Sequence, residues 1–138
     1  MQRVAEVRQA ARDGCVRVLY TRHMSLPKEV AGISQLRTAL AWQHVDRVAE
    51  VKPAFLRDSP AFRIIPELVP ASTEVVFDKI TMSAFESTPL NIALRDCGVT
   101  AFVIVGIALE VGIEPTVRHA TDLGSLQTNV KTVCELFR

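Results

Sequence analysis

Lys79 is the first residue whose type and position suggest chemistry. It directly follows a predicted strand, Glu74–Asp78, and begins the polar loop Lys79–Phe85. A lysine at a strand end can hold an anionic group or polarise a carbonyl, but a simply solvated lysine explains the position equally well. The turn Gly106–Gly112 is a second candidate, because it leads into a predicted helix whose free N–H groups suit an oxyanion. Every helix has such an end, so this signal is weak by itself.

The cysteines do not offer an evident nucleophile. A catalytic thiolate is favoured at a helix N-terminus or beside a cation. Cys97 instead lies in the last turn of a predicted helix and Cys15 just before a predicted strand, so we expect both to be buried structural thiols. Cys134 lies in a tail whose structure the pattern leaves ambiguous. The glycine motifs of serine hydrolases, P-loops and dinucleotide-binding folds do not occur in the sequence.

The histidines and nearby carboxylates give weaker signals. No histidine has metal-ligand spacing with a cysteine, so we expect neither a metal nor a cofactor. His119 and Asp122 on one helix fit a surface pair better than a catalytic dyad. Glu110 and Glu114 remain candidates for a general base that activates water, although glutamates near a helix start usually complement the helix dipole.

The elements that must position these residues alternate between helix and strand. Helical spacing of apolar residues, with Gly14, Gly98 and Gly124 as end residues, predicts helices near Val4–Ala11, Ile33–Ala41, Leu90–Leu94 and Ile113–Leu123. Apolar runs predict strands at Val16–Tyr20, Glu74–Asp78 and Ala101–Val105, the last one buried on both faces of a parallel sheet. The proline-rich stretch Lys52–Pro70 indicates a surface excursion, and Ser125–Arg138 has helical periodicity. The alternation predicts a doubly wound α/β sandwich.

The composition limits the classes of function. The chain has 138 residues, of which 49% are hydrophobic and 22% charged, as in one soluble globular domain rather than a disordered chain. A net charge of +1, without long runs of either sign, favours neither nucleic acid nor an anionic membrane as a partner. Arg3, Glu6 and Arg8 interrupt any signal sequence, and the longest apolar run is too short to span a bilayer. We therefore expect a soluble cytoplasmic protein that binds a small molecule.

Three ordered segments carry a resemblance to a known family. They are PELVP (Pro66–Pro70), FDKITMSAFESTPL (Phe77–Leu90) and LRDCGVTAFVIVGIALEVGIEPTVRHATDLG (Leu94–Gly124). Together with YTRH at Tyr20–His23, they resemble the isochorismatase-like family, the cysteine hydrolases, over most of the chain. The family motif K…SAF..T.L is matched by Lys79, Ser83, Ala84, Phe85, Thr88 and Leu90. The motif G…T..CV..T…A…G is matched by Gly106, Thr116, Ala120 and Gly124, with Leu109 where the first threonine stands.

The resemblance implies a Rossmann-like three-layer αβα sandwich with a mainly parallel sheet, which hydrolyses small amides, imides or a vinyl ether. Family members use an aspartate, a lysine and a cysteine nucleophile, and amides near a non-proline cis peptide form the oxyanion hole. Lys79 matches the lysine, and the cis peptide would lie at Ile107–Ala108. Substrate contacts are implied at His23, Phe85 and Leu109. Members are commonly oligomers, so we expect a homo-oligomer.

Two catalytic groups of the family pattern are missing. Gly112 stands at the nucleophile position and has no side chain with which to form a covalent intermediate. The family's aspartate ends a first strand that would precede the first helix, and the sequence after Gly124 resembles neither the strand nor the helix expected there. We therefore expect a partial domain over residues 1–124, without its first and C-terminal strands, and a divergent tail over 125–138. The absent first strand would leave a gap in the sheet, which another segment or another chain must fill.

Two functions are compatible with these departures. One is a hydrolase domain by descent that is catalytically impaired. The alternative is a non-catalytic module that binds a small carboxylate near Lys79 or serves in oligomerisation.

Overall fold

The computed structural model describes residues 2–124 and 133–135 of the chain. The longer elements, in chain order, are α1 (Gln2–Asp13), β1 (Leu19–His23), α2 (Ile33–Gln43), β2 (Val75–Lys79), α3 (Leu90–Asp96), β3 (Val105–Ile107), α4 (Glu114–Asp122) and β4 (Val133–Glu135). Short turns of helix form η1 (Val48–Glu50), η2 (Pro60–Phe62), η3 (Pro66–Leu68) and the π-helical η4 (Leu109–Ile113). The predicted alternation of helices and strands is thus confirmed.

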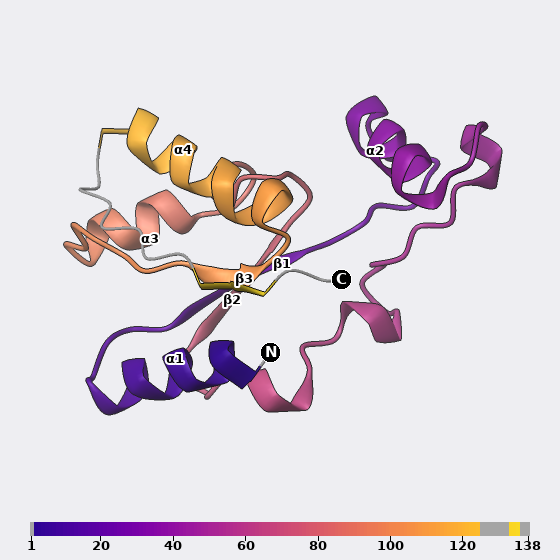
Figure 1. The fold of residues 1–138 in the computed structure, drawn as a ribbon. Helices are drawn as coiled ribbons and strands as arrows, with labels where there is room; N and C mark the ends of the chain where they lie inside the picture. The colour runs from indigo at the N-terminus through magenta and orange to yellow at the C-terminus, as the bar shows by residue number, and fades with distance from the viewer. Residues whose placement is uncertain (1, 125–132, 136–138) are drawn as a thin grey trace.

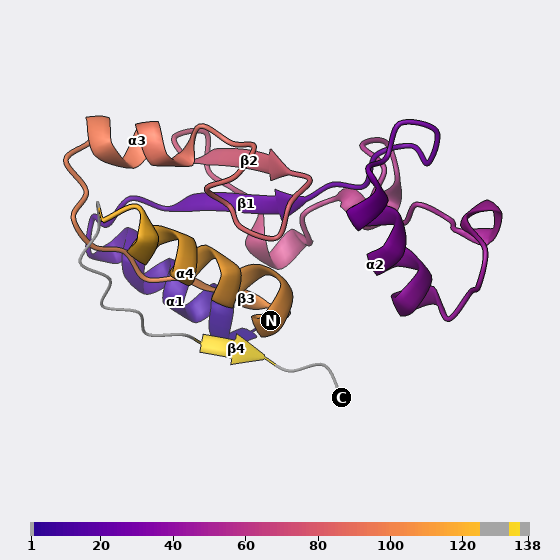
Figure 2. The same ribbon diagram turned by 90° about the horizontal axis from the view of Figure 1, so that it is seen from above.

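The strands form two parallel pairs in the middle layer of the molecule. β1 pairs with β2 and β3 pairs with β4, and no ladder joins the two pairs within the residues given above. Helices α3 and α4 lie over one face of the strands and α1 lies over the other, as Figures 1 and 2 show. The protein therefore has a Rossmann-like α/β fold, as predicted, with its strands divided into two pairs.

Strand β3 differs from its prediction in length and burial. The apolar run predicted a strand at Ala101–Val105 that is buried on both faces. Pairing covers only Val105–Ile107, and Val103 is 59% exposed. An apolar run becomes a buried strand only where neighbouring elements cover it. The sequence of the run does not reveal that β3 has β4 as its one paired neighbour among the described strands.

The C-terminal tail contains a strand, which corrects a second prediction. We expected a helix over Ser125–Arg138 and no strand in this region. β4 instead pairs in parallel with β3, with Val105 opposite Val133 and Ile107 opposite Glu135. An open strand edge offers backbone hydrogen bonds that can outweigh a weak helical periodicity. The remainder of this expected helix lies outside the described residues.

Two details of the turns also differ from expectation. The left-handed residue after α1 is Cys15, with a φ of 55°, rather than Gly14. Gly98 and Gly124 adopt the left-handed conformation after α3 and α4, as glycine does most readily. Cys15 and Cys97 are both exposed, so the prediction of buried thiols is wrong. The reason is that each lies at the junction of a helix and a surface turn rather than under the sheet.

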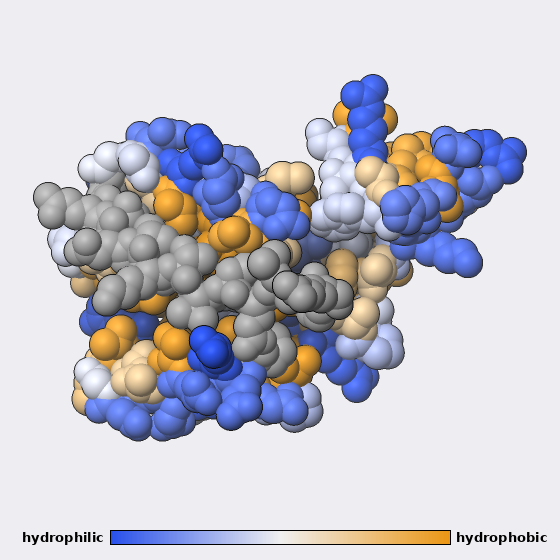
Figure 3. Space-filling model, viewed as in Figure 1, coloured by the Kyte–Doolittle hydropathy of each residue, from blue (hydrophilic) through white to orange (hydrophobic). Residues whose placement is uncertain are grey.

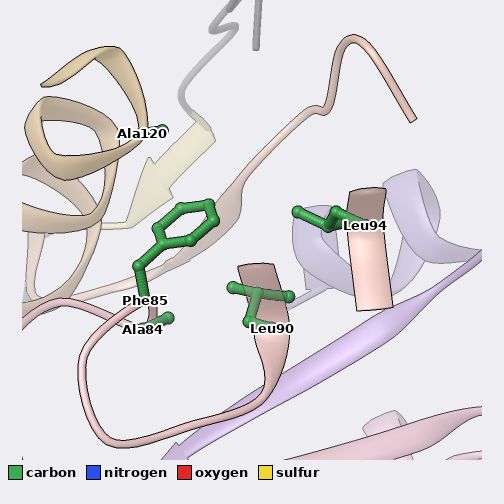
Figure 4. Packing of buried hydrophobic residues seen from close by; sticks show 5 residues of the cluster. All are labelled: Ala84, Phe85, Leu90, Leu94 and Ala120. Atoms are coloured by element: carbon green, nitrogen blue, oxygen red, sulfur yellow. The ribbon is translucent and has the colours of Figure 1, made fainter. Parts of the chain in front are cut away.

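The main hydrophobic cluster lies where α3, α4 and the loop after β2 meet (Figure 4). Its buried members are Ala84, Phe85, Leu90, Leu94 and Ala120. Thr88 fastens the loop to the start of α3, because its Oγ1 donates to the Ala84 carbonyl and accepts the Leu90 N–H. The cluster therefore holds the loop that follows Lys79 against both helices.

Residues 24–58, which we call the arm, project from the layered body (Figures 1 and 2). The arm carries α2 and η1 and is held by its own hydrogen bonds. The Gln43 side chain, for example, bonds both the N–H and the carbonyl of Lys52, at 2.9 and 3.0 Å. None of the helices in the described ranges combines the length and apolar character needed to cross a membrane.

Candidate functional site

His23 and Lys79 lie side by side at the carboxyl ends of the parallel strands β1 and β2. They are register partners, and so are Arg22 and Asp78 one residue earlier. Because successive side chains of a strand point to opposite faces, His23 and Lys79 share one face while Arg22 and Asp78 share the other. The carboxyl ends of parallel strands are where open α/β sheets bind ligands. Lys79 therefore lies at the end of a strand, as predicted.

Lys79 is a buried cation whose hydrogen bonds go to backbone carbonyls. It is 6% exposed, and its Nζ donates to the carbonyl oxygens of Thr81 at 2.7 Å and Met82 at 2.6 Å. No carboxylate of the described residues pairs with it. Burial lowers the pKa of Lys79 from its ordinary value of 10.5. An ammonium group has three donors, so one N–H is left for a ligand.

The carboxylate next to Lys79 in the sequence is occupied on the other face. Asp78 accepts a hydrogen bond of 2.9 Å from Nε of Arg22. The Arg22 guanidinium also lies 3.7 Å from the centre of the Phe62 ring and donates to the Phe62 carbonyl. These contacts fix the ends of β1 and β2 relative to each other. They engage Asp78, the neighbour of Lys79 in the sequence, so this carboxylate is paired with Arg22 rather than with Lys79.

The surroundings of His23 favour its neutral form. Burial lowers the pKa of His23 below its ordinary value of 6.5, and the positive charge of Lys79 lowers it further, against a hydrogen bond with the backbone of Thr81. Its ring meets the edge of Phe55 with 6.1 Å between the ring centres. A neutral imidazole can hydrogen-bond a ligand without repelling a cation beside it.

Gly112 lies in η4, and Thr116 connects it to the loop after β2. Thr116 is 2% exposed, and its Oγ1 donates to the Gly112 carbonyl at 2.6 Å and accepts the Ala84 N–H at 3.0 Å. Among the described residues, a Cβ built on Gly112 would meet no atom within 4 Å beyond its chain neighbours and its own helix backbone. The backbone at this position is not left-handed either, so neither space nor conformation requires a glycine there.

The turn before η4 does not contain the cis peptide bond that was expected there. Within the described residues all peptide bonds are trans, Ile107–Ala108 included. The chain instead reverses at Ala108, which is left-handed with φ 60° and ψ 71°, and whose carbonyl accepts the N–H groups of Val111 and Gly112. Ile107 and Leu109 on either side are 41% and 38% exposed. The turn therefore presents apolar side chains to solvent.

Phe85 belongs to the hydrophobic core rather than to an open pocket wall. It is 7% exposed, and its ring centre lies 6.1 Å from that of Phe102 and 5.9 Å from that of His119. Figure 4 shows the ring directed into the space between α3 and α4. This packing supports the Lys79 loop, and the substrate contact that the resemblance implies for Phe85 stays a prediction.

His119 has a partner that the sequence analysis missed. Its Nδ1 lies 3.0 Å from the Oγ of Ser83, which is 36 positions earlier in the chain. Ser83 Oγ already accepts the N–H of Phe85 at 3.2 Å, so its hydroxyl hydrogen is available to the imidazole. The expected surface pair with Asp122 is not formed as a hydrogen bond in the described part of α4. The only signal for this contact was the place of Ser83 in the family motif.

The remaining polar candidates do not join this group. Glu114 forms an ion pair with Arg118 one turn further along α4, and Glu110 is exposed. Both arrangements are typical of charges near a helix start. Among the residues whose placement is described, no three His, Cys, Asp or Glu side chains gather where they could hold a metal ion.

Comparisons with known proteins find the same family of domain and a similar fold elsewhere. The isochorismatase domain family matches residues 1–130. An isochorismatase family protein from Desulfovibrio vulgaris has 24% identity and a TM-score of 0.75, with 92% of this chain and 62% of that chain covered. A cysteine hydrolase from Pseudomonas syringae has 26% identity and a TM-score of 0.71, with 96% and 56% covered. A pyrazinamidase/nicotinamidase from Streptococcus mutans has 20% identity and a TM-score of 0.72, with 94% and 67% covered.

The present chain thus spans only 62% and 56% of the length of the first two of these proteins. Within that span, the family match takes in the strand end at Lys79 and the η4–α4 segment with Gly112. This chain belongs to the isochorismatase family.

Proposed function

We propose that this chain is an isochorismatase-family hydrolase domain that binds a small carbonyl or carboxylate compound beside Lys79 and is catalytically impaired. The observation that carries the proposal is the state of the Lys79 ammonium. It is buried, it is bonded to two backbone carbonyls, and it has no carboxylate partner among the described residues. A buried charge without a counter-ion is costly, so a negatively charged or polarised ligand oxygen would stabilise it.

The neighbouring residues have supporting roles in this proposal. His23 is the neutral hydrogen-bonding group next to the cation. Thr116 ties the Lys79 loop to η4, so the rest of the ligand would extend toward the exposed turn that contains Ile107, Ala108 and Leu109. Phe85 would support the loop by its packing and stays a predicted substrate contact.

The proposed loss of catalytic activity rests on Gly112. Relatives by resemblance use a cysteine at this position, and glycine offers no atom for a covalent intermediate. Because a Cβ at Gly112 would contact no described residue beyond its chain neighbours and its own helix, the position has room for ligand atoms. This open space favours the second candidate function, a non-catalytic module that binds a small carboxylate or serves in oligomerisation.

The remaining assignments are parts of the same proposal. We place the protein in the cytoplasm, as a homo-oligomer with a small molecule as its ligand and without nucleic acid as a partner. The net charge of +1 supports the last assignment, because nucleic-acid binding depends on clustered positive charge.

Binding is tested by calorimetric titration with benzoate and with benzamide. We expect the wild-type protein to bind benzoate, and Lys79→Met to lose this binding while keeping its circular dichroism spectrum. Lys52→Met, which removes an exposed lysine of the arm, is the matched control and should bind as the wild type does. Equal benzoate affinity in wild type and Lys79→Met would overturn the proposed site.

Catalysis is tested separately by ammonia release from benzamide and nicotinamide. We expect turnover no greater than that of the protein-free solution. Turnover that disappears in Lys79→Ala would show that the domain is an active hydrolase and that the proposed impairment is wrong. Benzoate binding without turnover would select the binding module over the hydrolase.

A further inference from the structure

We propose that His119 on α4 is a positioning residue for Lys79: through its hydrogen bond with Ser83, it holds in place the backbone carbonyls that bind the Lys79 ammonium. The inference rests on the function proposed above only as far as the ligand is concerned, because the placement of Lys79 can be measured without one.

The first observation is that the loop after β2 holds both polar groups of the candidate site. The Lys79 ammonium donates to the carbonyls of Thr81 and Met82, two and three residues further along the chain. The imidazole of His23 also forms a hydrogen bond with the backbone of Thr81. The geometry at Lys79 and His23 therefore depends on where the backbone of residues 81–82 lies.

The second observation is that the sheet does not fix this backbone. β2 ends at Lys79, and residues 80–89 form turns and bends without a strand or helix. The Thr81 hydroxyl donates to the carbonyls of Ser83 and Glu86, which belong to the same loop. Such local hydrogen bonds fix the shape of the loop but not its place relative to the strands and helices.

The third observation is that α4 holds two consecutive residues of the loop. Thr116 accepts the N–H of Ala84 at 3.0 Å, and Nδ1 of His119 lies 3.0 Å from Oγ of Ser83. Residues three apart lie on one side of a helix, and Figure 3 shows hydrophilic side chains along the outer side of α4 with hydrophobic ones beneath it. Because Ser83 directly follows Met82, the contact with His119 is the one next to the carbonyls that bind Lys79.

The contact is a directed hydrogen bond, and His119 adds ring packing to it. Ser83 Oγ accepts the N–H of Phe85, so its one hydrogen is free to go to Nδ1, which acts as acceptor. The ring of His119 also lies 5.9 Å from that of Phe85, centre to centre. An acceptor atom and an aromatic ring are separate contributions, and different substitutions remove each of them.

Loss of the acceptor atom has a definite consequence at Lys79. The carbonyls of Thr81 and Met82 would no longer be held in the place where both accept from one ammonium group. Hydrogen bonds to the charged form of a group favour that form, so their weakening adds to the effect of burial, which already lowers the pKa of Lys79. A ligand oxygen beside Lys79 would also meet an ammonium that is less well placed.

The test is the pKa of Lys79 in the ligand-free protein, measured by NMR of isotope-labelled lysine side chains, with Lys79→Met to identify the signal. His119→Phe keeps the ring and removes the acceptor, so we expect a lower pKa of Lys79 than in the wild type. His119→Asn keeps an acceptor near the position of Nδ1 and removes the ring, and should restore the wild-type value. None of these three side chains is charged at alkaline pH, so the comparison leaves the electrostatic surroundings of Lys79 unchanged.

Ser83→Ala removes the hydrogen-bond donor instead and gives an independent test if His119→Phe disturbs the fold. It should lower the pKa of Lys79 in the same direction, and the double variant should lower it no further than either single substitution does. Thr121→Val is the matched control, because it removes another side-chain hydrogen bond of α4, to Val117, and should leave the pKa of Lys79 unchanged.

Benzoate titration of the same variants connects the inference to the ligand. We expect the affinity to fall about threefold to tenfold in His119→Phe, as for the loss of one side-chain hydrogen bond, and to recover in His119→Asn.

The two readouts separate the inference from the proposed function. A wild-type pKa of Lys79 in both His119→Phe and Ser83→Ala would overturn the positioning role, even if benzoate binds as proposed. Equal effects of His119→Phe and His119→Asn would also overturn it, because the ring rather than the acceptor would then matter. A lowered pKa in His119→Phe that His119→Asn restores, in a protein that does not bind benzoate, would support the positioning role and overturn the proposed ligand.

Discussion

The hydroxyl of Thr116 donates a 2.6 Å hydrogen bond to the carbonyl of Gly112, four residues before it in the η4–α4 segment. The same oxygen accepts the N–H of Ala84 from the loop after β2. One buried hydroxyl therefore joins Gly112 to the loop that follows Lys79. The two halves of the candidate site are thus held together through the side chain of Thr116.

Replacing Thr116 by valine should separate these two segments. The buried Ala84 N–H would lose its acceptor, which typically costs about 1–3 kcal/mol of unfolding free energy, and the part-buried Gly112 carbonyl would lose one donor. We expect this loss in urea unfolding of Thr116→Val, together with weaker benzoate binding. Thr121→Val removes a similar hydroxyl bond, to Val117, from the exposed side of the same helix and should change stability little. Equal effects of the two substitutions would contradict this role of Thr116.

Gly112 should tolerate a side chain without loss of stability. Because a Cβ there meets no atom within 4 Å and the backbone is not left-handed, Gly112→Ala should leave the unfolding free energy unchanged or raise it by about 0.5–1 kcal/mol. Gly98→Ala is the contrasting variant. Gly98 has a φ of 65°, and a side chain there should cost about 1–2 kcal/mol. Thermal unfolding of both variants measures the difference, and a destabilised Gly112→Ala would show that the glycine is required by the fold.

The sequence predicts those parts of the site that depend on single elements. Lys79 and His23 end strands in the structure, and a strand end can be located from an apolar run and the polar loop behind it. Strand bounds are displaced, from Val16–Tyr20 to Leu19–His23 for example, because pairing with a neighbour decides where a ladder begins. The fold class follows from the alternation of elements, which does not depend on such bounds.

Contacts between distant segments could not be predicted in the same way. The Ser83–His119 pair and the Thr116 bridge join segments that are far apart in sequence, and neither residue type nor spacing indicates such a partner. The strand at Val133–Glu135 was missed for a related reason. Its structure depends on the open edge of β3 rather than on the periodicity of its own side chains.

Acid should weaken the attachment of α1 through Glu74. A bidentate hydrogen bond from Arg12, at 2.8 and 2.7 Å, lowers the pKa of Glu74 from 4.5 to about 2. The folded state therefore binds this proton less readily than the unfolded state, so the stabilisation is present above pH 4.5 and is lost as the pH falls toward 2. We expect the Tm of the wild type to fall more steeply through this range than that of Glu74→Gln. Glu67→Gln, at an exposed carboxylate, should keep the wild-type slope.

His23 should make the protein less stable just below neutral pH. Its pKa is lowered from 6.5 by burial and by Lys79, so the unfolded chain takes up a proton before the folded chain does. The free energy of unfolding therefore decreases as the pH falls below 6.5 toward the pKa of the folded state. It increases again when the pH is raised through the same range. His23→Gln, which does not titrate, should lack this part of the pH dependence in chemical unfolding measured at a series of pH values. His44→Gln, in the exposed turn after α2, is the control and should retain it.

Benzoate binding should be lost at a lower alkaline pH than a lysine of ordinary pKa would give. Burial lowers the pKa of Lys79 from 10.5, and only the protonated ammonium attracts a carboxylate. The affinity should therefore be constant near neutral pH and begin to fall at a pH below 10.5, whereas binding of the neutral benzamide should change less. Lys79→Arg separates charge from fit, because guanidinium stays protonated in this range: any residual benzoate binding of this variant should not depend on pH. A wild-type affinity that stays constant up to pH 10.5 would mean that the ligand does not use the Lys79 charge, and the site would then have to be sought away from the ends of β1 and β2.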